Sequence, residues 1–236
     1  NNNIANYNEG YRSITDDDKA NYTWGKKELW YVHSIETKSM VAQFYTEERK
    51  DGIGVQGENG GKDLSVKLRR LSEIRLYSKS DLYLNGVNAV PVKTVHFVYD
   101  ETYPLISQLP NNENGTGKLT LKGVWFSYGN NTKGKYNSYS FKYKVPVNQV
   151  YQDMQSDRWG TYRPKTANLN GLNNLEFPYA TQNKTDADEF ASYWQLNEIE
   201  LPSGGIIQVQ YESDDYSFVQ DRRAAQMCFL TGIGSN

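Results

Sequence analysis

The side chains that could transfer protons or act as nucleophiles are few in this sequence. Two histidines, His33 and His96, and a single cysteine, Cys228, are present. Both histidines fall inside alternating strand patterns, where a hydrogen-bonded structural imidazole is commoner than a catalytic base. No G-x-S-x-G nucleophile elbow occurs, and Cys228 lies in an apolar stretch that favours a small buried side chain. We therefore expect no catalytic residue, and we expect a change at either histidine to alter stability without altering an activity.

A run of three aspartates, Asp16, Asp17 and Asp18, is the candidate metal site. Hard cations such as Ca²⁺ need several oxygen ligands from one loop, which this run and Asn21 could supply. The alternative is an acidic turn in solvent, which also explains Asp214-Asp215. The sequence is compatible with Ca²⁺ bound by these aspartates. It predicts no other cofactor, since one cysteine cannot build a cysteine-based zinc site.

The glycines of residues 52–57 match the G-x-G-x-x-G spacing of dinucleotide-binding loops. That chemistry needs a strand that enters the loop and a helix that leaves it. Here the charged residues 47–51 precede the glycines, and more glycine follows where a helix would begin. We therefore interpret residues 51–62 as an exposed hairpin loop and expect no cofactor there.

Composition excludes several function classes. The 236 residues carry a net charge of −2, with lysine and arginine scattered along the chain, so a nucleic-acid footprint is absent. No apolar run is long enough for a membrane-spanning helix. Aromatic residues make up 14% of the chain, including 19 tyrosines, which argues against disorder. The chain begins at Asn1 without methionine, and we expect a single β-rich segment, residues 1–236, of a much longer protein.

Alternation of apolar and polar residues is the main structural signal, and it predicts antiparallel strands. A hairpin is expected from residues 29–35 and 40–45, and further strands from the segments 94–99, 139–145 and 207–211. The segment 63–77 is ambiguous between helix and strand, and we favour a strand from about residue 67. Glycine- and asparagine-rich loops are expected at residues 111–117, 129–135 and 168–174.

Three local features refine this prediction. The apolar phase of residues 119–128 changes at Lys122-Gly123, which indicates a β-bulge. Residues 186–194 have a helical pattern with acidic residues in the first turn. In the hairpin 196–211, Pro202 should end a strand and a following glycine should supply the positive φ of the turn. We expect Ile207, Val209 and Tyr211 to face the core of the protein.

A loose internal repeat links distant parts of the chain. The spacing Leu-x-x-Ile-x-Leu occurs at residues 71–76 and again at 196–201, and each copy leads to a strand that closes on an aromatic residue. Repeated hairpins with connections of unequal length are typical of a wound sheet rather than of a compact enzyme. The predicted fold class is therefore all-β, with antiparallel hairpins wound into a large sheet or shell and at most one or two short helices.

Several longer phrases carry a resemblance to a known class of proteins. They are residues 28–38 (ELWYVHSIETK), 91–100 (PVKTVHFVYD), 117–122 (GKLTLK), 157–162 (DRWGTY) and 201–215 (LPSGGIIQVQYESDD). This set resembles very large surface or secreted proteins of Bacteroidota-type bacteria that are similar to the Rhs/YD-repeat class. Tyr99-Asp100 fits the YD motif, whereas Tyr211-Glu212 departs from it. The resemblance implies hairpins wound into a shell, an exported location and no catalytic residue.

The expected function is that of a non-catalytic scaffold segment in a large exported bacterial protein. Its partners would be the remainder of its own polypeptide or associated surface proteins. The alternative is a carbohydrate-binding or adhesive surface module, because five tryptophans and many tyrosines could stack on sugar rings. Rings packed between layers would favour the scaffold, whereas several exposed rings in one plane would favour a glycan ligand.

Overall fold

The computed structural model describes residues 25–57, 60–99, 119–146, 151, 160–163, 184–214, 218–219 and 222–223. The candidate calcium ligands Asp16, Asp17 and Asp18 lie outside the described residues, as does Cys228. The loops expected at residues 111–117 and 168–174 lie outside them as well.

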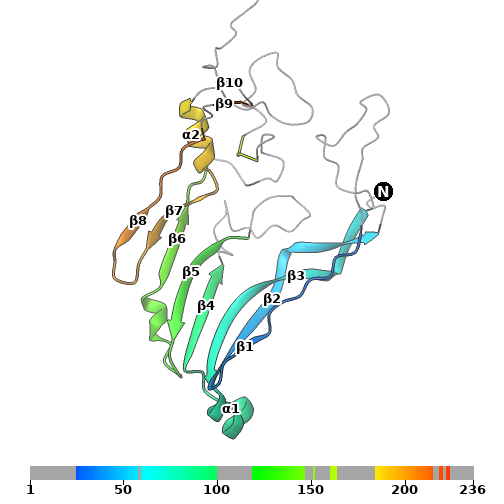
Figure 1. Ribbon diagram of the computed structural model, residues 1–236, viewed down its shortest axis with the longest axis vertical. Helices are drawn as coiled ribbons and strands as arrows, with labels where there is room; N and C mark the ends of the chain where they lie inside the picture. The colour runs from blue at the N-terminus through cyan, green and yellow to red at the C-terminus, as the bar shows by residue number, and fades with distance from the viewer. Residues whose placement is uncertain are drawn as a thin grey trace, which may run out of the picture.

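Eight strands form one sheet in which each strand pairs with its neighbours in the sequence (Figure 1). They are β1 (Ser34–Glu36), β2 (Met40–Gly57), β3 (Gly60–Ser78), β4 (Lys93–Tyr99), β5 (Leu121–Ser127), β6 (Tyr139–Tyr143), β7 (Leu196–Glu200) and β8 (Ile206–Gln208). Every pairing is antiparallel. A separate two-stranded ribbon consists of β9 (Phe218–Val219) and β10 (Arg222–Arg223). The all-β prediction is confirmed.

Helices are short in the described part of the chain. The α-helices are α1 (Lys79–Asn85) and α2 (Lys184–Ser192), and the 3₁₀ turns are η2 (Gly86–Asn88) and η3 (Lys133–Tyr136). The expected helix at residues 186–194 is thus confirmed as α2. Helix α1 was not predicted, although Ser78 before it and Gly86 after it, at φ 53°, are ordinary helix boundaries.

The register of the pairing gives the sheet two chemically different faces. On one face Phe44, Ile74, Val95 and Phe126 stand directly opposite one another across β2, β3, β4 and β5. These four residues are half-buried. Because side chains alternate between faces along a strand, their neighbours in sequence point to the other face, which is largely polar.

The β-bulge expected at Lys122-Gly123 is present. Val98 pairs with Gly123 and Tyr99 with Leu121, so Lys122 is the extra residue of β5. A Cβ atom on Gly123 would lie 2.7 Å from the carbonyl oxygen of Tyr139 in β6. Glycine at this position therefore lets β5 and β6 approach each other.

The expectation of an exposed loop at residues 51–62 is wrong. The predicted start of the following strand, near residue 67, is also wrong, because β3 begins at Gly60. Strands β2 and β3 continue outward as far as Gly57 and Gly60, with register shifts on the way. A Cβ on Gly52 would lie 2.5 Å from Leu68 Cβ, and one on Gly54 would lie 3.0 Å from Val66 Cβ. The glycines that match a nucleotide motif thus make room for side chains of the facing strand.

The hairpin of β7 and β8 confirms the predicted turn but not the predicted face. Pro202 lies two residues after Glu200, the last residue of β7, and Gly204 has a φ of 82°. Ile207, however, is 47% exposed and Tyr211 36% exposed, whereas Val209 is half-buried. Alternation could not show that β8 is a strand of only three residues at the end of the sheet order, so the predicted inward face is wrong for Ile207 and Tyr211.

An aromatic cluster packs beneath α2. The buried rings of Tyr162 and Trp194 contact Phe190 and Tyr193, and Trp194 meets Tyr151 edge to face at 5.4 Å. Burial, helped by the hydrogen bond to Glu189, raises the pKa of Tyr193 to about 12. The cluster anchors α2 to the end of β6, because the backbone N–H of Trp194 donates to the Lys144 carbonyl at 2.8 Å.

Candidate functional site

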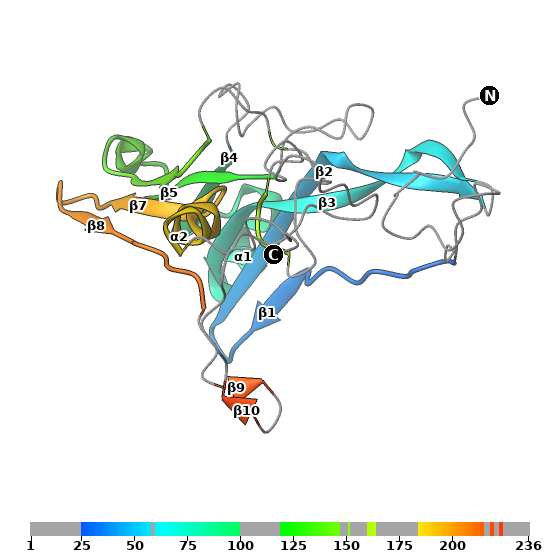
Figure 2. The same cartoon turned by 90° about the horizontal axis from the view of Figure 1, so that it is seen from above.

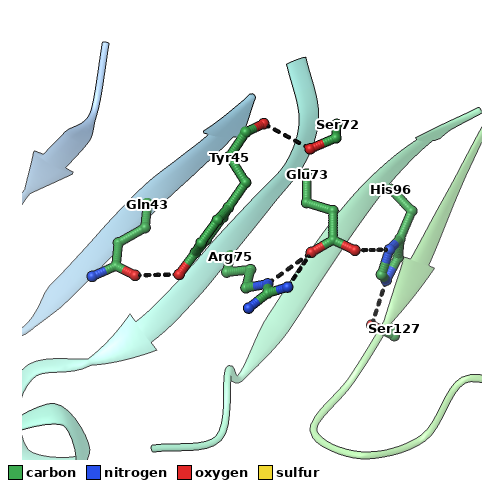
Figure 3. Close-up of polar contacts among 7 residues, drawn as sticks. All are labelled: Gln43, Tyr45, Ser72, Glu73, Arg75, His96 and Ser127. Carbon is green, nitrogen blue, oxygen red and sulfur yellow. Dashed lines mark hydrogen bonds and ion pairs between the residues drawn. The ribbon is translucent and has the colours of Figure 1, made fainter. Parts of the chain in front are cut away.

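His96 is the centre of a polar network on the face opposite the apolar row (Figure 3). Its Nδ1 lies 3.0 Å from Glu73 Oε1, and its Nε2 lies 2.8 Å from Ser127 Oγ. Because a carboxylate only accepts hydrogen bonds, the tautomer that fits these contacts donates from Nδ1 to Glu73 and accepts the Ser127 hydroxyl proton at Nε2. The imidazole also stacks on Trp125, with ring centroids 3.7 Å apart and planes 9° from parallel.

Strand register brings these residues together. Glu73, His96 and Trp125 are directly paired across β3, β4 and β5, and Ser127 follows on the same face, opposite Thr94. The hydrogen-bonded partners of His96 are 23 and 31 residues away in the sequence. Local sequence patterns therefore gave no signal that an acid, an imidazole and a hydroxyl would meet.

The network continues into β2 and β3. Arg75 donates from Nε to Glu73 Oε2 at 2.7 Å, so this carboxylate is shared between Arg75 and His96. The Arg75 guanidinium lies over the ring of Tyr45, 4.2 Å from its centroid, and Tyr45 donates its hydroxyl proton to Gln43. Burial raises the pKa of Tyr45 above its ordinary value, and so does its hydrogen bond with Tyr77.

Neither partner of His96 could be identified from the sequence, yet the structure places a carboxylate and a hydroxyl beside its ring. An acid, an imidazole and a serine in this order are the arrangement that activates a nucleophile in serine hydrolases. The side chains of His96 and Glu73 are 18% and 25% exposed, and Ser127 is buried at 5%.

The backbone around Ser127 differs from that of a hydrolase. Hydrolases stabilise the developing oxyanion with free N–H groups, commonly including that of the residue after the nucleophile. Here the N–H of Tyr128 donates to the Asn131 carbonyl at 3.3 Å, and the N–H of Gly129 donates to the Pro91 carbonyl at 3.1 Å. Ser127 also ends a regular strand rather than standing on a sharp turn into a helix. The Glu73–His96–Ser127 network can therefore join strands. The backbone N–H groups that follow Ser127 are already hydrogen-bonded to carbonyl groups of the protein, so they are not free to stabilise an oxyanion.

The other residues singled out from the sequence lie apart from this network. His33 is exposed and precedes β1. Glu198 in β7, a carboxylate not singled out from the sequence, also lies apart and accepts a hydrogen bond from Lys142 at 2.6 Å, which raises the pKa of that lysine. Asp214 is exposed, near Ser213, whose N–H and hydroxyl donate to Asp188 and lower the pKa of that carboxyl.

Two further observations concern the described residues as a whole. They contain no group of three or more histidine, cysteine, aspartate or glutamate side chains placed to hold a metal ion. None of their helices is long and apolar enough to cross a membrane. Comparison with known proteins found no matching family model, no matching curated protein and no matching solved structure.

Proposed function

We propose that this chain is a non-catalytic scaffold segment of a large exported bacterial protein, of the hairpin-wound kind that its longer phrases resemble. The proposal depends on one observation: the side chains that could carry out chemistry are hydrogen-bonded to one another between strands of the sheet. Glu73 and His96 are paired directly across β3 and β4, Ser127 lies on β5 opposite Thr94, and His96 bonds to both across strand boundaries.

Contacts like those of Glu73, His96 and Ser127 stabilise a sheet because they link neighbouring strands. Hydrogen bonds that involve a charged partner contribute roughly 1.5–3 kcal/mol each, and a stacked ring pair adds roughly 0.5–1.5 kcal/mol. In a sheet of successive hairpins, side-chain pairs between neighbouring strands contribute directly to stability. A scaffold gains from these contacts, whereas a catalyst needs a serine that a substrate can reach, and Ser127 is only 5% exposed.

The glycan-binding alternative needs several exposed rings on one surface. Trp30 is 87% exposed, and Tyr83 and Tyr136 are 89% and 77% exposed. Trp30, however, precedes β1, whereas the two tyrosines lie in connections at the end toward which β1 runs. Trp30 therefore lies apart from the two exposed tyrosines, and the described residues place no exposed tryptophan beside them.

Labelling with a fluorophosphonate tests the proposal, because this reagent reacts with activated serine hydroxyls. We expect no adduct on Ser127 by mass spectrometry of the intact chain, and the same background for Ser127→Ala. An adduct on Ser127 that disappears in His96→Gln would contradict the proposal, because the imidazole would then be activating the serine.

A further inference from the structure

The connection between β3 and β4 contains α1 and lies at the lower end of the ribbon in Figure 1. Several large apolar side chains of this connection are exposed. Tyr83 and Leu84 of α1 are 89% and 76% exposed, and Val87 of η2 is fully exposed at 101%. We call Tyr83, Leu84 and Val87 the apolar tip. Apolar residues gathered on a protruding surface mark interaction sites in soluble proteins.

The connection that bears the apolar tip is braced from within. Asp81 accepts a hydrogen bond from the Asn85 side chain at 2.6 Å and another from the backbone N–H of Val90 at 2.9 Å. The N–H of Ala89 donates to the Gly86 carbonyl at 3.1 Å. The three apolar side chains therefore point outward from a hydrogen-bonded loop, and this preorganisation lowers the entropic cost of docking.

Positive charge surrounds the tip. In an antiparallel meander the connections β1–β2, β3–β4, β5–β6 and β7–β8 lie at the same end of the sheet. These connections contain the exposed lysines Lys38, Lys133 and Lys135, together with Lys79, which pairs with Glu36 at 2.9 Å. When the strand residues next to the connections are counted as well, the five lysines at this end (Lys38, Lys79, Lys93, Lys133 and Lys135) outnumber the three acidic residues Glu36, Asp81 and Glu200 by two. This end is therefore basic, although the whole chain has a net charge of −2.

Tyrosines complete the surface. Tyr136 in η3 is 77% exposed and Tyr128 after β5 is 59% exposed, and the ammonium of Lys135 lies 5.1 Å from the centre of the Tyr136 ring. Aliphatic side chains, tyrosines and lysines are the combination found where proteins rest at a membrane–water boundary. Tyrosine is suited to this boundary because its ring is apolar and its hydroxyl stays hydrated.

We propose that the α1 end of the sheet docks on the surface of an anionic lipid bilayer. Tyr83, Leu84 and Val87 enter the boundary between headgroups and acyl chains, and Lys38, Lys133 and Lys135 approach the anionic headgroups. Charge complementarity favours a lipid surface over a protein partner, because the lysines are spread over separate connections. Such a spread matches the extended negative charge of an anionic bilayer. This docking is peripheral and goes beyond the scaffold role.

Vesicle sedimentation tests the proposal with the full 236-residue chain. The wild type should sediment with vesicles of phosphatidylglycerol and phosphatidylcholine in equal parts, and much less with phosphatidylcholine alone. The double variant Leu84→Ser/Val87→Ser should bind about tenfold or more weakly, because it loses most of the inserted aliphatic surface. Each of Lys133→Gln and Lys135→Gln should weaken binding by about fivefold.

The matched control removes the same residue types from another exposed site. Leu64 and Val66 on β3 are each 58% exposed, at the outer end of the β2–β3 hairpin. Leu64→Ser/Val66→Ser should sediment like the wild type. Equal loss in both double variants would overturn the proposal, as would failure of the wild type to bind anionic vesicles. Unchanged binding by Leu84→Ser/Val87→Ser would also overturn it and would direct the search to a protein partner for the tip.

Discussion

Replacing Gly123 by alanine tests the packing of the central strands. The new Cβ would lie 2.7 Å from the Tyr139 carbonyl oxygen, whereas an ordinary carbon-to-oxygen contact is about 3.3–3.6 Å. The obstacle is backbone of the neighbouring strand, so it cannot rotate away as a side chain could. Strands β5 and β6 would have to separate by more than about half an ångström.

The cost of that separation follows from the pairing. Strands β5 and β6 are joined through Gly123 with Ser140 and through Val124 with Tyr139, so the clash falls on their shared ladder. Overpacking costs about 1–3 kcal/mol, and each weakened hydrogen bond costs about 1 kcal/mol. We expect Gly123→Ala to lower the free energy of unfolding by about 2–3 kcal/mol.

Urea melts followed by circular dichroism would measure this change, provided that the slope of each transition stays the same. Gly57→Ala is the matched control, because Gly57 also lies in a strand and a Cβ there would have no neighbour within 4 Å. It should change stability by no more than about 0.5 kcal/mol. If Gly123→Ala melts at the same urea concentration as Gly57→Ala, the assigned register of β5 and β6 is wrong.

Further predictions concern the last hairpin and the aromatic cluster. Gly204→Val should destabilise the chain by about 1–2 kcal/mol, because φ at Gly204 is 82° and a β-branched residue fits that region badly. Gly205→Val, which would make ordinary contacts at 3.6 Å, should cost clearly less in the same urea melts. Tyr193 has a pKa of about 12 instead of 10.0, so its neutral form is favoured in the folded chain. Its contribution to stability is complete below pH 10 and is lost as the pH rises toward 12. Tyr193→Phe should therefore lose less stability than the wild type over that interval, and parallel losses in alkaline melts would refute the assignment.

Features set by local sequence were predictable. The bulge at Lys122-Gly123 follows from a phase change within one strand, and α2 follows from its acidic first turn. The turn at Gly204 follows from the glycines after Pro202. Each of these depends on residues a few positions apart, where steric preferences of the backbone decide the conformation.

Features set by pairing between distant strands were not predictable. The outer part of the β2–β3 hairpin was taken for a loop because its strands carry glycines and charges, yet Gly52 is needed beneath Leu68. The outward face of Ile207 depends on what covers β8, which alternation does not report. The contacts of His96 depend on the register of three strands, and nothing within any one of those strands specifies it.

The central claim is that Glu73, His96 and Ser127 hold the sheet together instead of performing chemistry. A double-mutant cycle in urea, with His96→Ala, Ser127→Ala and the combined variant, measures the energy of their contact directly. His33→Ala serves as the control, because His33 is exposed outside the strands. The proposed structural role predicts that His96→Ala costs about 2–4 kcal/mol and that His96 and Ser127 are coupled by about 1 kcal/mol. A coupling near zero, with His96→Ala as stable as His33→Ala, would contradict it.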